Sequence, residues 1–556
     1  MGRAARHTAM LGRCIIVLLA SLGARAFAAD CSDRVDRASP LLANGYTGNL
    51  ANTRAYASPI TSAKVARLQL ALSHAATGSG EKRGAPAVTQ QAVFFAAGRE
   101  LIAMNRLSGC RYWTYTIPQR RDANRQNALR SSSIYLLAER TDQPALLLAG
   151  DYFGHYYAVD AQSGALRWSR FVGTEADHHM VTGGSQFHDG KLLVPVASKE
   201  VLLTIHELLR LCCSSHGLLQ ALDAYTGETI WTYHSTADAS YQPSSRRLAP
   251  NGASLWGTPA VDTRRRRVYV GTGQNLTPPA TDNSDAIVAL DFDSGAPLWV
   301  FQSTAGDAWN AGCELRPPLR SDCVEPAGHD FDIGAAPMLV VRSGRPDLLI
   351  AGGKNGVVYA LDPDTGALQW QRKLGRGGTL GGVHWGMASD GTRLYVGIND
   401  VQLAKGSTPT LINRLLVKPS DPPPGETRPG VYALDLDGGA VLWEQHPTHL
   451  HEGVAQPSHY SAALSVTNDV VFAASLDGVV KAFRSGDGAE LWSYDTAGDY
   501  VDVEGKPGNG GTIDSVGAIV AGGDVLVNSG YDSFGKAGPA QAGPGNMLLI
   551  FRLPEA

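Results

Sequence analysis

The sequence of 556 residues lacks several features that would place it in common protein classes. It contains no Cys-x-x-Cys-His motif for covalent haem and no GxGxxG motif preceding a helix, which argues against a haem-bearing chain and a nicotinamide enzyme. The apolar run from Cys14 to Leu22 is shorter than the roughly 20 residues of a membrane-spanning helix, and no later stretch approaches that length. We therefore expect no membrane span and a soluble mature protein.

Positive charge is scarce once the N-terminus is removed. Residues 1–29 are typical of a secretory signal, with arginines ahead of the apolar run and a small-residue site, Ala26-Phe27-Ala28-Ala29, behind it. Cleavage near Asp30 takes away four arginines and no acid, so the net charge falls from -4 to -8, which argues against a nucleic-acid partner. We expect a periplasmic or secreted protein without a lipid anchor, because Cys31 follows Asp30 rather than a small residue. The run Arg264 to Arg267 is interpreted as a solvated hairpin tip between two strands.

Cysteine is also sparse. Six cysteines remain after cleavage, an even number in a chain bound for an oxidising compartment. They allow three disulfides: Cys313 with Cys323, Cys31 with Cys110, and the adjacent Cys212 with Cys213. The sequence leaves the connectivity open, and Cys212 and Cys213 are alternatively two free thiols of the core.

One motif, by contrast, recurs seven times. Each copy is a strand-like stretch, a polar turn with glycine four residues before a tryptophan, and a second strand-like stretch. The tryptophans, spaced by 55, 63, 68, 71, 73 and 49 residues, are Trp113, Trp168, Trp231, Trp299, Trp370, Trp443 and Trp492. Such spacing is typical of propeller blades, in which a tryptophan at a fixed place packs against the neighbouring sheet.

We therefore predict an all-β fold, a single β-propeller formed by residues 30–556. The tail GNMLLIFRLP (545–554) supplies a further strand, and the residues before Gly84 are available as its partner, so eight blades are favoured over seven. Helix should be scarce, with Thr204 to Leu211 as the best candidate.

The repeat and its spacing resemble the quinoprotein alcohol dehydrogenase superfamily, whose eight-bladed propellers hold pyrroloquinoline quinone (PQQ) and Ca²⁺ at the axis. The segment Cys212-Cys213-Ser214-Ser215-His216-Gly217 is most similar to polyvinyl alcohol dehydrogenases, in which a vicinal disulfide covers one face of the quinone. The resemblance implies that Cys212 and Cys213 contact the cofactor. Those enzymes carry arginine where this chain has His216, which leaves the contact to a cofactor carboxylate open.

The segment GASLWGTPAVDTRRRRVYVGTGQN (252–275) resembles the part of the family that lies beneath the quinone and binds the metal. The resemblance implies that Trp256 is the floor under the cofactor, that Ser254 contacts the cofactor and that Gln274 offers its carbonyl oxygen to Ca²⁺. Considered without the family, Trp256 is equally well a core residue.

The segment GHDFDIG (328–334) resembles the family segment with the catalytic aspartate, which implies that Asp332 is the general base and a metal ligand. Glu200 matches the remaining metal-binding carboxylate. Considered singly, each acid is a solvated loop charge.

Weaker matches complete the set. Lys354 resembles the cationic residue beside the quinone oxygens, Thr182 a cofactor-contacting threonine, and Arg83 an arginine of the polymer-oxidising enzymes. His384-Trp385 either lines the substrate opening or packs in the core.

The resemblance implies an alcohol oxidation in which Asp332 removes the hydroxyl proton and hydride passes to the quinone, while Lys354 stabilises the developing charge. Because the chain has no haem motif, a separate cytochrome c or other carrier is implied as electron acceptor. The suggested substrate is a secondary alcohol, small or polymeric, reached past loops such as 402–430. The competing hypothesis is a non-catalytic propeller that acts as an interaction scaffold, like the outer-membrane assembly lipoprotein that shares the tryptophan repeat.

Overall fold

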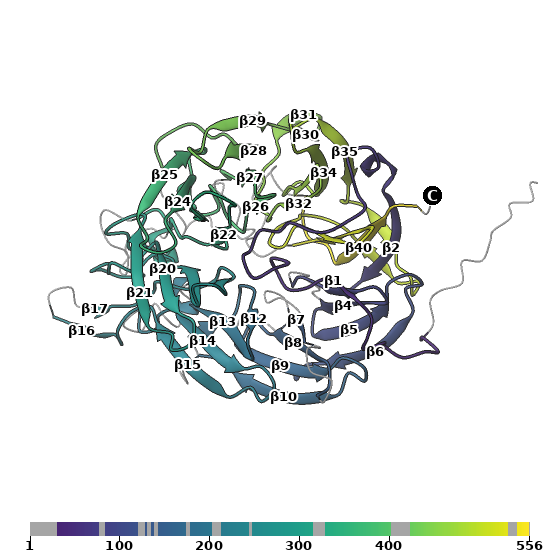
Figure 1. The fold of residues 1–556 in the computed structure, drawn as a ribbon, viewed down its shortest axis with the longest axis horizontal. Helices are drawn as coiled ribbons and strands as arrows, with labels where there is room; N and C mark the ends of the chain where they lie inside the picture. Colours follow the sequence, from purple (N-terminus) through teal and green to yellow (C-terminus); the bar gives the residue numbers. More distant parts are fainter. Residues whose placement is uncertain are drawn as a thin grey trace, which may run out of the picture.

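Eight antiparallel sheets of four or five strands surround a central axis (Figure 1), which confirms the predicted all-β, eight-bladed propeller. The computed structural model describes residues 30–76, 84–120, 128–129, 135–137, 143–173, 178–202, 213–243, 247–314, 328–401, 423–531 and 542–554. The predicted signal, the candidate helix 204–211 and most of the loop 402–430 lie outside these residues. Among them, helix is limited to three short 3₁₀ turns, η1 (Val65–Arg67), η2 (Lys199–Leu202) and η3 (Ala311–Glu314).

Each repeat motif forms the third and fourth main strands of a blade. The first three blades contain β1 (Leu41–Ala43), β3 (Ala87–Thr89), β4 (Ala92–Ala97), β5 (Glu100–Asn105) and β6 (Arg111–Thr116); β7 (Tyr135–Leu137), β8 (Leu146–Gly150), β9 (His155–Asp160) and β10 (Leu166–Phe171); and β11 (His179–Met180), β12 (Gln186–His188), β13 (Lys191–Ser198), β14 (Leu218–Asp223) and β15 (Thr229–His234). The next three contain β18 (Ala260–Asp262), β19 (Arg267–Gly271), β20 (Ala286–Asp291) and β21 (Pro297–Gln302); β22 (Met338–Val340), β23 (Leu348–Gly352), β24 (Val357–Leu361) and β25 (Leu368–Lys373); and β26 (Ala388–Ser389), β27 (Arg393–Ile398), β28 (Gly430–Asp435) and β29 (Val441–Gln445). The seventh contains β32 (Ser465–Thr467), β33 (Val470–Ala474), β34 (Val479–Arg484) and β35 (Glu490–Asp495).

Three two-stranded hairpins extend loops between blades. They are β16 (Ser240–Gln242) with β17 (Arg247–Ala249), β30 (Thr448–His451) with β31 (Val454–Pro457), and β36 (Asp499–Val501) with β37 (Pro507–Asn509).

The repeat tryptophans join each blade to the next. The indole N–H of Trp299 donates to the carbonyl of Pro363 in the following blade at 3.3 Å, and Trp113, Trp168, Trp231, Trp370 and Trp443 make the equivalent bond. The ring lies against the turn glycine of that blade, so a Cβ atom on Gly366 would come within 2.6 Å of Trp299. The motif therefore encodes both halves of one contact, the indole and the glycine that receives it.

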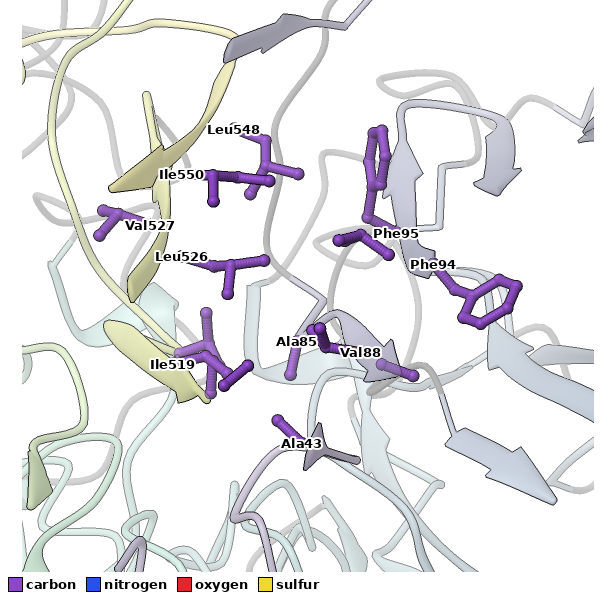
Figure 2. Packing of buried hydrophobic residues seen from close by; sticks show 14 of the residues in the cluster. Ala43, Ala85, Val88, Phe94, Phe95, Ile519, Leu526, Val527, Leu548 and Ile550 are labelled. Carbon is purple, nitrogen blue, oxygen red and sulfur yellow. The ribbon is translucent and has the colours of Figure 1, made fainter. Parts of the chain in front are cut away.

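The eighth blade closes the ring with strands from both ends of the chain. It consists of β38 (Ala518–Ala521), β39 (Asp524–Ser529), β40 (Met547–Arg552) and β2 (Gln69–Ala75), and β2 pairs with β40 as expected for the tail strand. Figure 2 shows Leu526 and Ile550 of this blade facing Val88 and Phe95 of the first blade within one buried cluster. Trp492 of the last repeat contacts Phe551 of β40 with ring centroids 5.4 Å apart.

The segment from Leu50 to Tyr56 crosses the inner strands of four successive blades, an element that the sequence did not predict. Its carbonyls accept hydrogen bonds from residues of β18, β22, β26 and β32. Arg54, only 1% exposed, donates through its guanidinium to the carbonyls of Leu464, Val516 and Ala518. The segment thus ties together blades whose first strands meet at the axis.

Other expectations are tested by the same structure. The Cys31–Cys110 disulfide is present. Cys213 and Cys313 are each disulfide-bonded, but their predicted partners Cys212 and Cys323 lie outside the described residues. No helix in the described part of the chain is both long and apolar enough to cross a membrane.

The arginine run occupies the turn between β18 and β19, as predicted. The guanidinium groups of this run also form ion pairs with aspartates of both neighbouring blades. Arg265 lies 2.9 Å from Asp347, and Arg266 lies 3.1 Å from Asp189.

Alanine at two turn glycines tests the contact between blades. Gly366 (φ +75°) lies against Trp299, whereas Gly344 (φ +71°) has open space at the Cβ position. Both substitutions carry the same left-handed backbone cost, roughly 1–2 kcal/mol. We expect Gly366→Ala to lower the free energy of unfolding by about 1–3 kcal/mol more than Gly344→Ala, because only it overpacks a buried contact. Equal losses in urea unfolding would contradict the proposed role of the indole–glycine contact.

Candidate active site

Antiparallel blades bring the predicted site residues to one end of the propeller. Loops that join the second strand of a blade to the third, and loops that join one blade to the next, lie at the same end because strand direction alternates. Gln274 follows β19, Lys354 follows β23, and Trp256 and Asp332 precede β18 and β22. These four residues are 18 to 98 positions apart in the sequence, and the fold makes them neighbours in space.

Asp332 is the centre of this arrangement. Its Oδ2 atom accepts hydrogen bonds from Lys354 Nζ at 2.6 Å and from Trp256 Nε1 at 3.2 Å. Its Oδ1 atom accepts one from the backbone N–H of Gln274 at 3.2 Å. The structure thus brings together four of the residues implied by the family resemblance, and both carboxylate oxygens face donors from three different loops.

Two glycines permit this close packing. A Cβ atom on Gly273 would collide with Asp332 Oδ1, and one on Gly334 would collide with the indole of Trp256. Trp256 also contacts Trp385 and His384 edge-on, with ring centroids 5.2 and 5.6 Å away. Trp256 therefore packs against other aromatic residues and also contacts Asp332. The two interpretations from the sequence, a core residue and a residue of the site, are compatible.

Lys354 is buried among acids. Its Nζ atom lies 3.2 Å from Asp330 Oδ1 and 5.1 Å from the centre of the Trp256 ring. Burial opposes the ammonium form, but Asp330 and Asp332 outweigh it and raise the pKa of Lys354 above its ordinary value. Lys354 is therefore a fixed positive charge at neutral pH.

Acidic side chains nevertheless outnumber basic ones in this region. Burial raises the pKa of Asp330 well above its ordinary value despite Lys354, and burial together with Asp307 does the same for Asp285. Asp285 and Asp307 are both buried, with exposed fractions of 0% and 5%. One ammonium beside several buried carboxyl groups creates an environment in which a bound cation is stabilised.

Gln274 offers a free oxygen next to these acids. Its side chain is 3% exposed, and its Nε2 atom donates to the carbonyl of Trp309 at 3.3 Å. Its Oε1 atom is buried without a partner among the described residues. Such a buried amide oxygen without a partner, in a residue whose backbone N–H contacts Asp332, suits Ca²⁺, which prefers several hard oxygen ligands.

Glu200 has different neighbours. Its carboxylate accepts hydrogen bonds from the backbone N–H groups of Ser214 at 2.8 Å and Ser215 at 2.6 Å, and from the Ser215 hydroxyl. In the described part of the chain, no hydrogen bond or ion pair joins it to Asp332 or Gln274. Glu200 thus anchors the segment after Cys213, which is itself fully buried.

The remaining predicted residues differ in their surroundings. Thr182 has a buried hydroxyl without a partner in the described part of the protein, next to Gly183, which packs on the backbone of Trp256. The Ser254 hydroxyl accepts a hydrogen bond from the backbone of Ser198 at 3.0 Å. Arg83 and Cys212 lie outside the described residues.

Two histidines near the site are held by other side chains. His216 Nε2 lies 2.8 Å from His234 Nδ1, and burial, followed by His234 and His179, lowers the pKa of His216 to about 4. His216 is therefore neutral at pH 7 and does not reproduce the charge of an arginine. His384 is packed against Trp256, and its Nδ1 atom lies 2.7 Å from Ser461 Oγ, which in turn donates to Asp514.

Several polar residues of this region were missed by sequence reasoning. Asp330 lies two residues before Asp332 in the segment GHDFDIG, so the sequence could have indicated that both acids belong to the site. Asp285 and Asp307 belong to loops without a motif, and only the fold brings them near Asp332. A cavity of about 370 Å³ lies elsewhere, between the N-terminal segment and the first three blades, and contains none of the predicted site residues in its lining.

Comparison with known proteins identifies the family of the chain. A family model described as glucose/ethanol/alcohol dehydrogenase, beta-propeller domain, matches residues 44–322, and one described as outer membrane protein assembly factor BamB matches residues 354–530. The chain is 33% identical over 537 residues to a polyvinylalcohol dehydrogenase of Pseudomonas sp, covering 93% of this chain and 78% of that protein. It is 32% identical over 491 residues to a polyvinylalcohol dehydrogenase of Sphingopyxis sp. (strain 113P3), covering 85% and 70%.

A solved structure supports the fold independently. The crystal structure of quinohemoprotein alcohol dehydrogenase from Comamonas testosteroni superposes with a TM-score of 0.64 at 19% identity, covering 93% of this chain and 82% of that one. Three findings lead to one conclusion. The sequence similarity extends over most of the chain, the solved structure has a matching propeller, and the family model describes an alcohol dehydrogenase propeller. The chain belongs to the PQQ-dependent dehydrogenase family, and it is an oxidoreductase of the alcohol dehydrogenase type.

Proposed function

We propose that this protein is a PQQ- and calcium-dependent dehydrogenase that oxidises secondary alcohols, small or polymeric, to ketones and passes electrons to a separate cytochrome c or similar carrier. The observation that carries the proposal is the contact of Asp332 with Lys354, Trp256 and Gln274. The polyvinyl alcohol substrate is suggested by the names of the relatives. We further propose that residues 1–29 direct export and that residues 30–556 form the mature periplasmic or secreted enzyme.

The residues fit the cofactor and the metal. Trp256 offers a flat apolar face with Lys354 above it, and this combination suits a planar anion. We infer that Cys212, Cys213, Ser254, Thr182 and Arg83 complete the quinone site. We infer that Asp332, Gln274 and Glu200 hold Ca²⁺, with Glu200 turning from the Ser214 and Ser215 amides to do so.

PQQ, when bound, supplies the two-electron oxidant that accepts hydride from the alcohol carbon, and Ca²⁺ supplies a Lewis acid. The chain itself supplies the proton acceptor. We infer that Asp332 Oδ2 takes the hydroxyl proton, since Lys354 and the indole N–H of Trp256 fix the direction of this oxygen. Lys354 also stabilises negative charge that develops beside it during hydride transfer.

Reconstitution tests the proposed function directly. The purified mature protein is incubated with PQQ and Ca²⁺, and dye reduction is measured with polyvinyl alcohol, small secondary alcohols and primary alcohols. We expect activity only with both additions, and a higher kcat/KM for secondary than for primary alcohols. Absence of both activity and quinone absorbance after gel filtration would support the non-catalytic scaffold instead.

Substitution of the base tests its assignment. Asp332→Asn keeps a group of the same size but does not accept the proton, so we expect kcat to fall by roughly 10²–10⁴-fold. Quinone absorbance after gel filtration should be retained. The matched control is Asp487→Asn, an exposed aspartate in the turn of the seventh repeat. Full activity of Asp332→Asn would rule out this residue as the base.

Substitution of the free amide tests the metal site. Gln274→Ala removes a neutral oxygen ligand, and we expect the Ca²⁺ concentration for half-maximal activity to rise at least about 10-fold. Isothermal titration with Ca²⁺ provides a readout independent of turnover. Gln371→Ala, at an exposed position of β25, is the control. An unchanged Ca²⁺ affinity in Gln274→Ala would contradict the ligand assignment.

A further inference from the structure

A second group of metal-binding side chains lies in the third blade. His216 precedes β14, His234 is the last residue of β15 and pairs with Leu218, and Asp238 follows in the loop before β16. One ligand atom from each of the three residues lies within 4.8 Å of the other two. The antiparallel pairing of β14 with β15 therefore places both imidazoles at the same end of the blade, where the loop brings the carboxylate to them.

The donor set differs in kind from that around Asp332. Two imidazole nitrogens and one carboxylate oxygen suit Zn²⁺ and similar first-row metals, whereas Ca²⁺ prefers oxygen ligands alone. Zn–N bonds of about 2.0–2.1 Å in tetrahedral geometry place two nitrogens roughly 3.3 Å apart. His216 Nε2 and His234 Nδ1 are 2.8 Å apart, so a small rotation of either ring admits the ion.

Exposure makes the group accessible on one side. His216 is 4% exposed, whereas His234 and Asp238 are exposed to solvent. An ion can enter from the solvent side and retain water in the remaining coordination position, while the buried ring gives the site a fixed wall.

We propose that His216, His234 and Asp238 bind a divalent transition metal, with Zn²⁺ as the representative ion, at a site separate from the calcium site. The metal connects β15 to the segment Cys213–Gly217. The same segment donates the Ser214 and Ser215 amides to Glu200, and the His216 carbonyl lies 3.0 Å from His179 Nε2. Zinc binding therefore stabilises a segment that borders the proposed cofactor site.

Metal binding by the full-length mature protein tests the proposal without any assay of alcohol oxidation. Equilibrium dialysis against micromolar Zn²⁺, in a large excess of Ca²⁺, should give one bound Zn²⁺ per chain. Co²⁺ in place of Zn²⁺ should give a visible absorption band from nitrogen ligation. His234→Ala and Asp238→Asn should each weaken Zn²⁺ binding by about 10–100-fold.

His234 and Asp238 are exposed, so we expect both variants to fold. Thermal unfolding in EDTA should give the same midpoint temperature for the two variants as for the unsubstituted protein. His446→Ala is the matched control. His446 is a surface histidine 3.7 Å from the Glu444 carboxylate, and in the described part of the chain it belongs to no cluster of three possible metal ligands. The control substitution should leave Zn²⁺ binding unchanged. The proposal would be overturned if the unsubstituted protein bound no Zn²⁺. It would also be overturned if the His234→Ala variant bound Zn²⁺ as tightly as the unsubstituted protein does. Either result leaves the proposed alcohol oxidation untouched.

Discussion

The architecture depends on one contact, the repeat tryptophan of a blade docked on the turn glycine of the next. The indole needs a flat neighbour without a side chain, and its N–H needs a carbonyl, so each turn supplies a glycine with positive φ and an exposed carbonyl. The contact joins successive blades from the first to the seventh, so the angle between them is set locally and repeated along this part of the ring. The eighth blade has no repeat motif, and apolar packing together with the pairing of β2 with β40 replaces the missing contact there.

A rigid ring explains how the site holds so many buried acids. Asp285 precedes β20, whereas Asp307, Asp330 and Asp332 lie on the connection between β21 and β22, and both connections are fixed by blades that cannot move without disturbing their neighbours. Separation of these acids would relieve repulsion, but the blades prevent it. The proposed metal and the ammonium of Lys354 then compensate charge that the fold has brought together.

The fold was largely predictable because its determinants are local. Seven copies of the glycine–tryptophan motif specify seven blades, and the tail 545–554 indicates the eighth because it supplies a strand that needs a partner. The segment Leu50–Tyr56 was not predictable, since it contains no periodic apolar pattern and is held by backbone bonds and by Arg54. Residues singled out from motifs, such as Trp256, Asp332 and Lys354, are in contact in the structure, and their roles at the site stay predictions. The sequence predictions missed Asp285 and Asp307, whose importance arises only from three-dimensional proximity, and they did not foresee that Glu200 would be engaged by Ser214 and Ser215.

We propose that the loops around Asp332 form a quinone and calcium site. The most direct test is a crystal structure of the protein after incubation with PQQ and Ca²⁺. We expect planar density in contact with the Trp256 ring and beside Lys354. We also expect a metal peak within about 2.3–2.6 Å of Gln274 Oε1 and an Asp332 carboxylate oxygen. Density for the quinone at another place on the propeller, or an ion that avoids both residues, would contradict the account.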